Sequence, residues 1–192
     1  FAFALLPALR IVYRDRPADL AAAIGRHARL FNSHPYLAPL ALGAVARLEV
    51  EDRPPEVIER FKAAVRGALG GLGDRLVWAG WRPACILTAL ALLLAGAPWW
   101  IAVVGFLVVY NVGHLVLRVW AFRLGWVEST AIAARLRTSW IWDAERVLRS
   151  LGPALLGACA VFAVAGHGPV LPRLSATWVL VALAGLVLGM AA

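Results

Sequence analysis

The chain has 192 residues, of which 62% are hydrophobic, and its mean hydropathy of +0.77 lies well above that of a typical soluble domain. Its net charge of +8 does not indicate nucleic-acid binding, because the basic residues flank apolar runs instead of covering a polar surface. Cys85 and Cys159 are isolated in apolar segments, so the sequence indicates neither a disulfide framework nor a metal site.

Residues 83–117 form an apolar run of 35 residues without Asp, Glu, Lys or Arg. A single transmembrane helix needs roughly 20 apolar residues. A soluble globule of this size has no core that would hold such a run. The sequence therefore predicts an all-α integral membrane protein.

The first region, residues 1–75, is mixed in polarity and contains two amphipathic helical patterns, at residues 20–31 and 56–69. Such helices either pack on a partner or lie in the membrane interface, and the sequence does not choose between these. Residues 36–48 lie between them and are apolar, but they are too few to span a bilayer. We expect a re-entrant or buried helix there.

The apolar run itself is too long for one span, since a helix of that length would extend for roughly 50 Å. Gly96-Ala97-Pro98 interrupts it near its middle. We therefore expect a transmembrane hairpin within residues 76–117, with arms at about 76–95 and 99–117. The first arm brings Arg82 to membrane depth, and Pro83 is a candidate break in that arm.

Residues 118–150 are rich in Arg and Trp, which is typical of a segment at the membrane interface. Residues 151–192 then predict a second hairpin, with arms at 151–170 and 174–190. The positive charge of residues 1–75 and 118–149 places both regions on the cytoplasmic side. The expected architecture comprises N-terminal amphipathic helices and a re-entrant segment, followed by two transmembrane helical hairpins.

Two motifs in the first region combine polar side chains with turn residues. The first runs from Arg26-His27 to the Asn-Ser-His-Pro-Tyr sequence of residues 32–36, and its residues suit a helix–turn–helix junction. The second is the glycine-rich stretch of residues 67–83. It lacks the Gly-Lys-Ser/Thr of a P-loop, and no strand precedes it as in a dinucleotide-binding fingerprint. Asp74 in this stretch is expected to cap a helix, to form an ion pair or to contact a ligand.

These two motifs, in this order and at this separation, resemble the enzyme IID family of the mannose/fructose/sorbose phosphotransferase systems. The similarity extends over about residues 1–127, and it implies that a few tens of N-terminal residues precede Phe1 in the natural protein. Beyond Trp126 the chain is shorter than the family pattern. This leaves a second interpretation open, a shortened regulatory or scaffold protein that binds other components of the system without transporting sugar.

The resemblance implies a protein that forms, with the membrane component IIC, the translocation path for a hexose that is phosphorylated on entry. The phosphorylated component IIB, charged by IIA, would act from the cytoplasm. The resemblance also implies the bacterial inner (cytoplasmic) membrane, a multimer of IIC–IID pairs, and no cofactor, metal or catalytic residue in this chain. Hexose hydroxyls need polar partners and an aromatic face. The candidate sugar contacts are Asn32, His34, Asp74, Trp78, Arg82 and, more weakly, Glu49.

Overall fold

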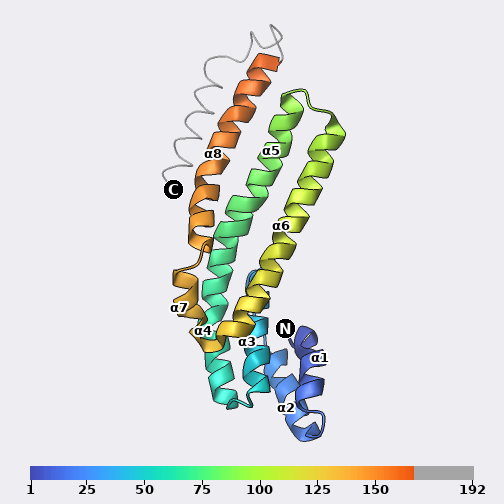
Figure 1. Cartoon of the computed structure of the whole chain (residues 1–192), viewed down its shortest axis with the longest axis vertical. Coiled ribbons are helices and arrows are strands. Elements are labelled where there is room, and N and C mark those ends of the chain that lie inside the picture. Colours follow the sequence, from blue (N-terminus) through green and yellow to red (C-terminus); the bar gives the residue numbers. More distant parts are fainter. Residues whose placement is uncertain (167–192) are drawn as a thin grey trace. The chain divides into compact units, whose positions relative to one another are not determined.

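The computed structural model describes residues 1–166, and these residues form helices joined by short connections, without a strand (Figure 1). The elements are α1 (Ala2–Val12), α2 (Pro17–Ala28), α3 (Ala38–Val50), α4 (Pro55–Gly73), the π-helical segment η1 (Asp74–Trp81), α5 (Arg82–Leu94), α6 (Trp99–Glu128), the 3-10 turn η2 (Ser129–Ala131), α7 (Ile132–Arg137) and α8 (Ile141–Gly166).

The chain divides into two compact units. The first comprises Phe1–Val77 and Asn111–Trp142, and the second comprises Trp78–Tyr110 with the chain from Asp143 onward. The chain crosses between the units three times, and each crossing falls inside a helical segment, so η1, α6 and α8 each contribute residues to both units. Each unit is described by itself below.

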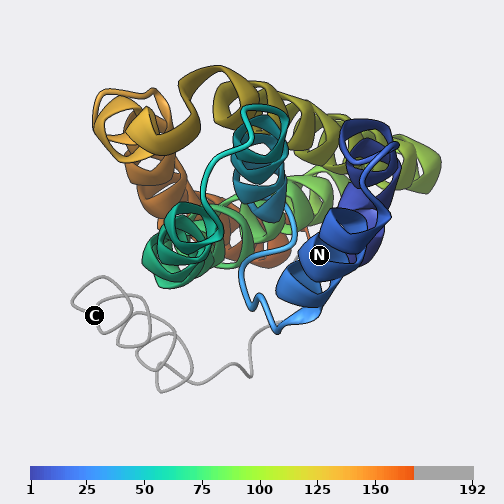
Figure 2. The same ribbon diagram turned by 90° about the horizontal axis from the view of Figure 1, so that it is seen from below.

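Helix α3 is the core of the first unit. Figure 2 shows it between α4 on one side and the α1–α2 pair on the other. Its side chains are buried almost all round, with Leu40, Ala41, Ala44, Val45 and Leu48 at most 1% exposed. A helix that is apolar on every face is one that neighbours cover completely. The short apolar stretch at residues 36–48 is thus a buried helix within this unit.

Two glycines allow α3 and α6 to meet backbone to backbone. A Cβ atom on Gly43 would clash with the carbonyl oxygen of Phe122, and one on Gly125 would clash with the carbonyl oxygen of Leu40. Small residues at such crossings let helices in membranes approach closely and gain van der Waals contact. The glycine pair thereby fixes the C-terminal half of α6 against the core helix of the first unit.

The two predicted amphipathic helices are α2 and α4. Each begins with a proline at its first position, where the missing N–H costs nothing, and each has an acidic residue in its first turn. Lys62 of α4 is only 5% exposed, and its Nζ donates a hydrogen bond of 3.0 Å to the carbonyl oxygen of Arg26 near the end of α2. The ammonium group therefore satisfies a terminal carbonyl of α2 and ties the two helices together.

The sequence suggested that the helix of residues 56–69 ends before the first membrane arm. In the structure, α4 instead continues through η1 into α5. Pro55–Leu94 is a single helical stretch of 40 residues, and Pro83 does not break it. Pro83 lies in the first turn of α5, where the hydrogen-bond register changes from π to α. An absent N–H is tolerated at such a position because it would lack a regular partner. Long π-helical segments are rare and are frequently associated with functional sites.

The interruption expected at Gly96–Pro98 is the turn of a helical hairpin in the second unit, where α5 and the start of α6 lie side by side (Figure 1). Gly96 has a φ of +88°, and the amides of Gly96 and Ala97 donate to the carbonyls of Leu93 and Leu92. This is the Schellman arrangement, in which the left-handed residue is usually glycine. Helix α8 contacts α5 through Cys159, whose sulfur lies 3.4 Å from the carbonyl oxygen of Leu87.

Helix α6 continues to Glu128, beyond the expected end at residue 117, so Arg118 and Arg123 lie in a helix and not in an interfacial loop. Arginine has a high intrinsic helix propensity, so extending the helix through these residues has little free-energy cost. The second predicted hairpin begins with α8, which starts at Ile141, ten residues earlier than expected. Its proposed second arm, residues 174–190, lies outside the described residues.

Three helical stretches of residues 1–166 are long and apolar enough to cross a membrane, namely Pro55–Leu94, Trp99–Arg137 and Ile141–Val164. Their apolar side chains are widely exposed, as expected where lipid or a partner provides the surroundings. The molecule is an all-α integral membrane protein.

Candidate functional site

The first motif ends in a tight turn built on His34. Its carbonyl oxygen accepts hydrogen bonds from the amides of Leu37 and Ala38, at 3.0 and 2.8 Å, and so begins α3. The amide of Tyr36 donates to His34 Nδ1 at 3.2 Å, which makes Nδ1 an acceptor and assigns the proton to Nε2 in the neutral ring. The predicted turn therefore also buries His34, which is 2% exposed, and fixes the orientation of its ring.

The second motif meets the first at this histidine. Gly73 lies so close to the His34 side chain that a Cβ atom at this position would clash with His34 Cβ and Cγ. The next residue is Asp74, at which the chain passes from α4 into η1. Burial lowers the pKa of His34, the Asp74 carboxylate opposes this effect, and the Arg118 guanidinium adds to it. His34 is accordingly neutral at neutral pH.

The carboxylate of Asp74 is exposed, and within residues 1–166 it takes part in no salt bridge. Of the roles that the sequence left open, neither an ion pair with Arg75 nor a capping hydrogen bond occurs in the described part of the chain. The Arg75 side chain instead extends back toward Gly71. Asp74 thus presents a charged acceptor beside His34.

Helix α6 brings further polar and aromatic groups to the same place. The His114 ring stacks on the Tyr36 ring, with centroids 4.8 Å apart and planes inclined by 14°. Arg118, one turn further along α6, places its guanidinium carbon 4.7 Å from the centre of the Tyr36 ring. His114 Nε2 lies 3.1 Å from Asn111 Oδ1, so these two polar groups of the spanning helix form a contact of their own. We call His34, Tyr36, Asp74, His114 and Arg118 the His34 cluster.

Asn32 lies exposed in the extended segment that leads to His34. Trp78 and Arg82 belong to the second unit, where the Arg82 guanidinium carbon lies 5.3 Å from the centre of the Trp78 ring. The structure thus brings His34 and Asp74 together in the first unit, and Trp78 and Arg82 together in the second.

Glu49 lies in a second, closed cluster of polar side chains, which we call the Glu49 cluster. Its carboxylate is 1% exposed and accepts hydrogen bonds from Tyr13 Oη at 2.5 Å, from Arg26 Nη2 at 2.8 and 3.1 Å, and from His27 at 2.6 Å. Because a carboxylate only accepts, His27 must carry a proton on Nε2. Arg26 and His27, the start of the first motif, therefore tie α2 to α3.

Burial and the hydrogen bonds within the Glu49 cluster shift the pKa values of its members. Burial alone would raise the pKa of Glu49, but the hydrogen bonds from His27, Tyr13 and Arg26 outweigh it and lower the pKa to about 2. Burial and the bond to Glu49 raise the pKa of Tyr13 to about 12. With both oxygens occupied by protein donors, Glu49 is suited to a structural role, and we set it aside as a sugar contact.

Sequence reasoning missed the contribution of Tyr36 and Arg118 to the His34 cluster. The sequence pattern treats Tyr36 as part of the turn, and Arg118 as the start of an interfacial loop. A signal was present, because His114 and Arg118 stand four residues apart and so share one face of an apolar helix. Ionisable residues at that depth are rare without a functional or structural reason.

This geometry defines a helical membrane protein with a polar, aromatic cluster held between a core helix and a spanning helix. The sequence profile of the family described as "PTS system mannose/fructose/sorbose family IID component" matches residues 1–171. The chain belongs to this family.

Individual relatives agree with that assignment. The chain is 31% identical over 137 residues to the PTS system sorbose-specific EIID component of Lacticaseibacillus casei, a match that covers 69% of this chain and 48% of the relative. It is 25% identical over 163 residues to the PTS system mannose-specific EIID component of Escherichia coli (strain K12), covering 82% and 57%. The chain thus spans about half the length of the curated relatives it matches.

A solved structure shares the fold. A chain from the cryo-EM structure of the mannose transporter ManYZ with microcin E492 superposes with a TM-score of 0.63. The match has 24% sequence identity and covers 82% of this chain and 59% of the other. This likeness independently supports the helical architecture.

Proposed function

We propose that this chain is the membrane-embedded IID component of a phosphoenolpyruvate-dependent sugar phosphotransferase system. With the IIC component it forms the translocation path for a hexose that is phosphorylated on entry. The IIA and IIB components deliver the phosphoryl group from the cytoplasm, and the IIC–IID pairs form a multimer in the bacterial inner membrane. Membership in the IID family supports this proposal.

The observation that carries the site assignment is the meeting of the two motifs at His34 and Gly73. A hexose needs hydrogen-bond donors and acceptors for its hydroxyls and an aromatic face for its apolar ring surface. Asp74 offers a charged acceptor, which forms stronger hydrogen bonds than a neutral one. Asn32 offers an amide on the adjoining segment, and Tyr36 an aromatic ring that a guanidinium already polarises.

The remaining candidate sugar contacts, Trp78 and Arg82, lie in the second unit. Trp78 is 40% exposed, and the Arg82 guanidinium rests over its ring. An exposed indole with a cation behind it suits contact with a sugar ring. We propose that Trp78 and Arg82 also contact the sugar, and that this chain supplies no catalytic residue to the phosphoryl transfer.

The experiment is reconstitution with the cognate components. The chain is co-expressed with the IIC component, membrane vesicles are prepared, and uptake of radiolabelled hexose is measured with phosphoenolpyruvate and the soluble components. Phosphorylated sugar should accumulate in the vesicles only when both membrane components are present. If the IIC–IID complex assembles but no sugar enters, transport is refuted, and the chain serves as a non-transporting scaffold or regulatory protein.

A further inference from the structure

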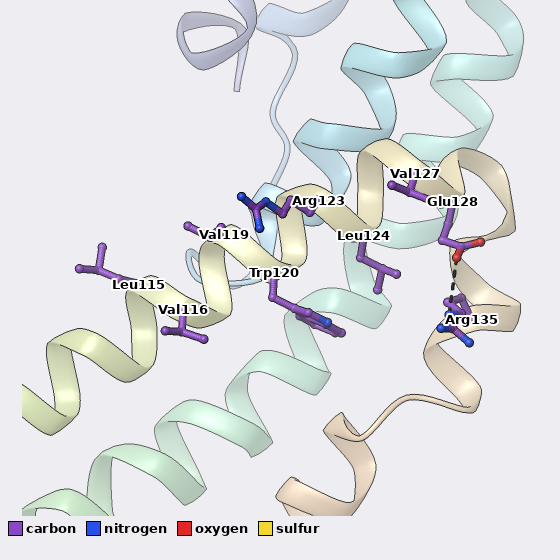
Figure 3. Close-up of a pocket in the computed structure, with 9 residues that line it drawn as sticks. All are labelled: Leu115, Val116, Val119, Trp120, Arg123, Leu124, Val127, Glu128 and Arg135. Carbon is purple, nitrogen blue, oxygen red and sulfur yellow. Dashed lines mark ion pairs between the residues drawn. The ribbon is translucent and has the colours of Figure 1, made fainter.

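Arg118 is an ionisable residue on an apolar spanning helix. Its neighbours Leu115, Val116 and Val119, drawn in Figure 3, are 53%, 61% and 52% exposed. Arg118 is less exposed than these aliphatic side chains, and its guanidinium lies over the ring of Tyr36 at the turn before α3. Ionisable residues within membrane helices are rare, and such a residue points to a function by default.

The described chain supplies no anion for Arg118. Within residues 1–166 this side chain forms no salt bridge, and its Nε atom is buried without a hydrogen-bond partner. The Tyr36 ring attracts the cation, but the face of an aromatic ring has no lone pair that would satisfy the five N–H donors of a guanidinium. A buried donor without an acceptor has a free-energy cost, so the surroundings of Arg118 are incomplete in the isolated chain.

Two other arginines of the first unit have the carboxylate that Arg118 lacks. Arg26 Nη2 lies 2.8 Å from Glu49 Oε1, and Arg135 Nε lies 3.5 Å from Glu128 Oε1, the contact marked in Figure 3. Arg118 is instead a partly buried cation whose counter-charge comes from outside the described residues.

Asp74 carries a negative charge near the same histidine but does not neutralise Arg118. Besides burial, the Asp74 carboxylate and the Arg118 guanidinium both shift the pKa of His34, in opposite directions, so both charges act at this place. The two nevertheless form no salt bridge with each other. A carboxylate accepts hydrogen bonds from hydroxyl groups, whereas a guanidinium donates to anions. The pair is therefore complementary to a ligand that carries both hydroxyl groups and an anionic group.

We propose that Arg118 binds the phosphate group of the phosphorylated hexose, while Asp74 accepts hydrogen bonds from its hydroxyls. The inference rests on the proposed function, which supplies a sugar that gains a phosphate group on entry. The planar fork of a guanidinium matches two phosphate oxygens and makes charge-assisted hydrogen bonds to them. Arg118 would distinguish the phosphorylated product from the neutral sugar, and it takes no part in the phosphoryl transfer itself.

The test is isothermal titration calorimetry of the IIC–IID complex in detergent, with inorganic phosphate as the probe and the ionic strength held constant. Arg118→Gln should weaken phosphate binding at least about tenfold, because the charge-assisted hydrogen bonds are lost. Arg118→Lys keeps the charge but not the planar fork, and it should weaken binding about threefold. The matched control is Arg123→Gln, which removes an exposed charge from the same helix and should change binding less than about twofold.

A variant with the opposite effect keeps the proposal falsifiable if Arg118→Gln folds poorly. Asp74→Asn removes the negative charge that repels an anion at this site, so phosphate should bind several-fold more tightly. Misfolding does not produce such a gain. Unchanged or weaker phosphate binding by Asp74→Asn would contradict a phosphate site beside this carboxylate.

Equal phosphate binding by wild type and Arg118→Gln, or an equal loss in Arg123→Gln, would overturn the proposal. So would a wild-type complex that binds no phosphate together with an Arg118→Gln chain that no longer associates with the IIC component, because the counter-charge would then be a carboxylate of that partner. Failure of the proposed function gives a different result. A complex that binds phosphate through Arg118 but takes up no sugar would refute transport and leave this anion site in place.

Discussion

The Glu49 cluster and the His34 cluster both draw on the first motif and its surroundings, residues 26–49, yet they differ in how their charge is used. In the Glu49 cluster a buried carboxylate is surrounded by three donors and is closed to any further partner. In the His34 cluster the carboxylate of Asp74 remains exposed and outside any salt bridge of the described chain. The difference indicates that the first half of the motif holds α2 on α3, whereas the second half lies beside an exposed hydrogen-bond acceptor that suits a substrate.

The largest effect on stability is expected from Glu49→Ala. Removing the carboxylate leaves the guanidinium of Arg26, whose side chain is 12% exposed, without its partner, and breaking a largely buried pair typically costs about 3–5 kcal/mol. The free energy of unfolding can be measured by denaturant titration in detergent. Glu51→Ala is the control, since its ion pair with Arg47 is exposed and contributes about 0.5 kcal/mol or less. Similar losses for the two variants would contradict a closed, stabilising cluster.

Acid should act on the Glu49 cluster in a defined pH range. The pKa of Glu49 is about 2 in the folded chain and about 4.3 when unfolded, so its contribution is complete above the unfolded value and is lost as the pH falls toward 2. The loss for wild type should reach about 3 kcal/mol, from about 1.36 kcal/mol per pKa unit. Glu49→Gln cannot titrate at this position and should show a shallower stability profile between about pH 5 and pH 2. Parallel profiles would mean that Glu49 is not the titrating group.

A smaller effect on stability is expected at the His34 cluster. Tyr36→Leu removes the stacking on His114 and the contact with Arg118, which together contribute about 1–2 kcal/mol. If the ring also faces the sugar, uptake per assembled complex should fall at least about tenfold. Tyr110→Leu, which removes a stacked tyrosine from the second unit, serves as a comparison. Full uptake by Tyr36→Leu would remove this ring from the sugar path.

Asn32→Ala should change the free energy of unfolding least, by less than about 0.5 kcal/mol, because the side chain is exposed. Uptake should nevertheless decrease about fivefold if the amide contacts a sugar hydroxyl, since one hydrogen bond contributes roughly 1 kcal/mol. Initial uptake rates, normalised to the amount of IIC–IID complex, measure this effect. An unaltered uptake rate would show that Asn32 does not contact the sugar.

The helical class, the membrane location and the hairpin turn were predictable from the sequence, because each rests on a local signal. Gly96 suits the positive φ that the turn requires, and an uncharged run longer than a span needs lipid. Boundaries were less predictable. The continuation of α4 into α5 depends on a π-helical register that accommodates Pro83, and nothing in local propensity indicates that register.

The candidate site was predictable only in part, for a related reason. The motifs marked His34 and Asp74 as polar residues beside turns, but their proximity depends on Gly73 resting against the histidine ring. Glu49 looked like a candidate because it is acidic and close to the first motif. Its three partners come from α2 and from the residue that follows α1, so only tertiary structure reveals that it is already satisfied.

Asp74→Asn tests the central claim most directly, because it removes the exposed charge of the His34 cluster while preserving size and helical context. Phosphoenolpyruvate-dependent sugar uptake should be measured in vesicles that contain equal amounts of assembled IIC–IID complex, with Asp52→Asn as the control for loss of an exposed carboxylate. We predict at least about a tenfold decrease for Asp74→Asn and little change for Asp52→Asn, since hydrogen bonds to charged groups contribute about 1.5–3 kcal/mol. Wild-type uptake by the Asp74→Asn complex would contradict the assignment of this cluster to the sugar path.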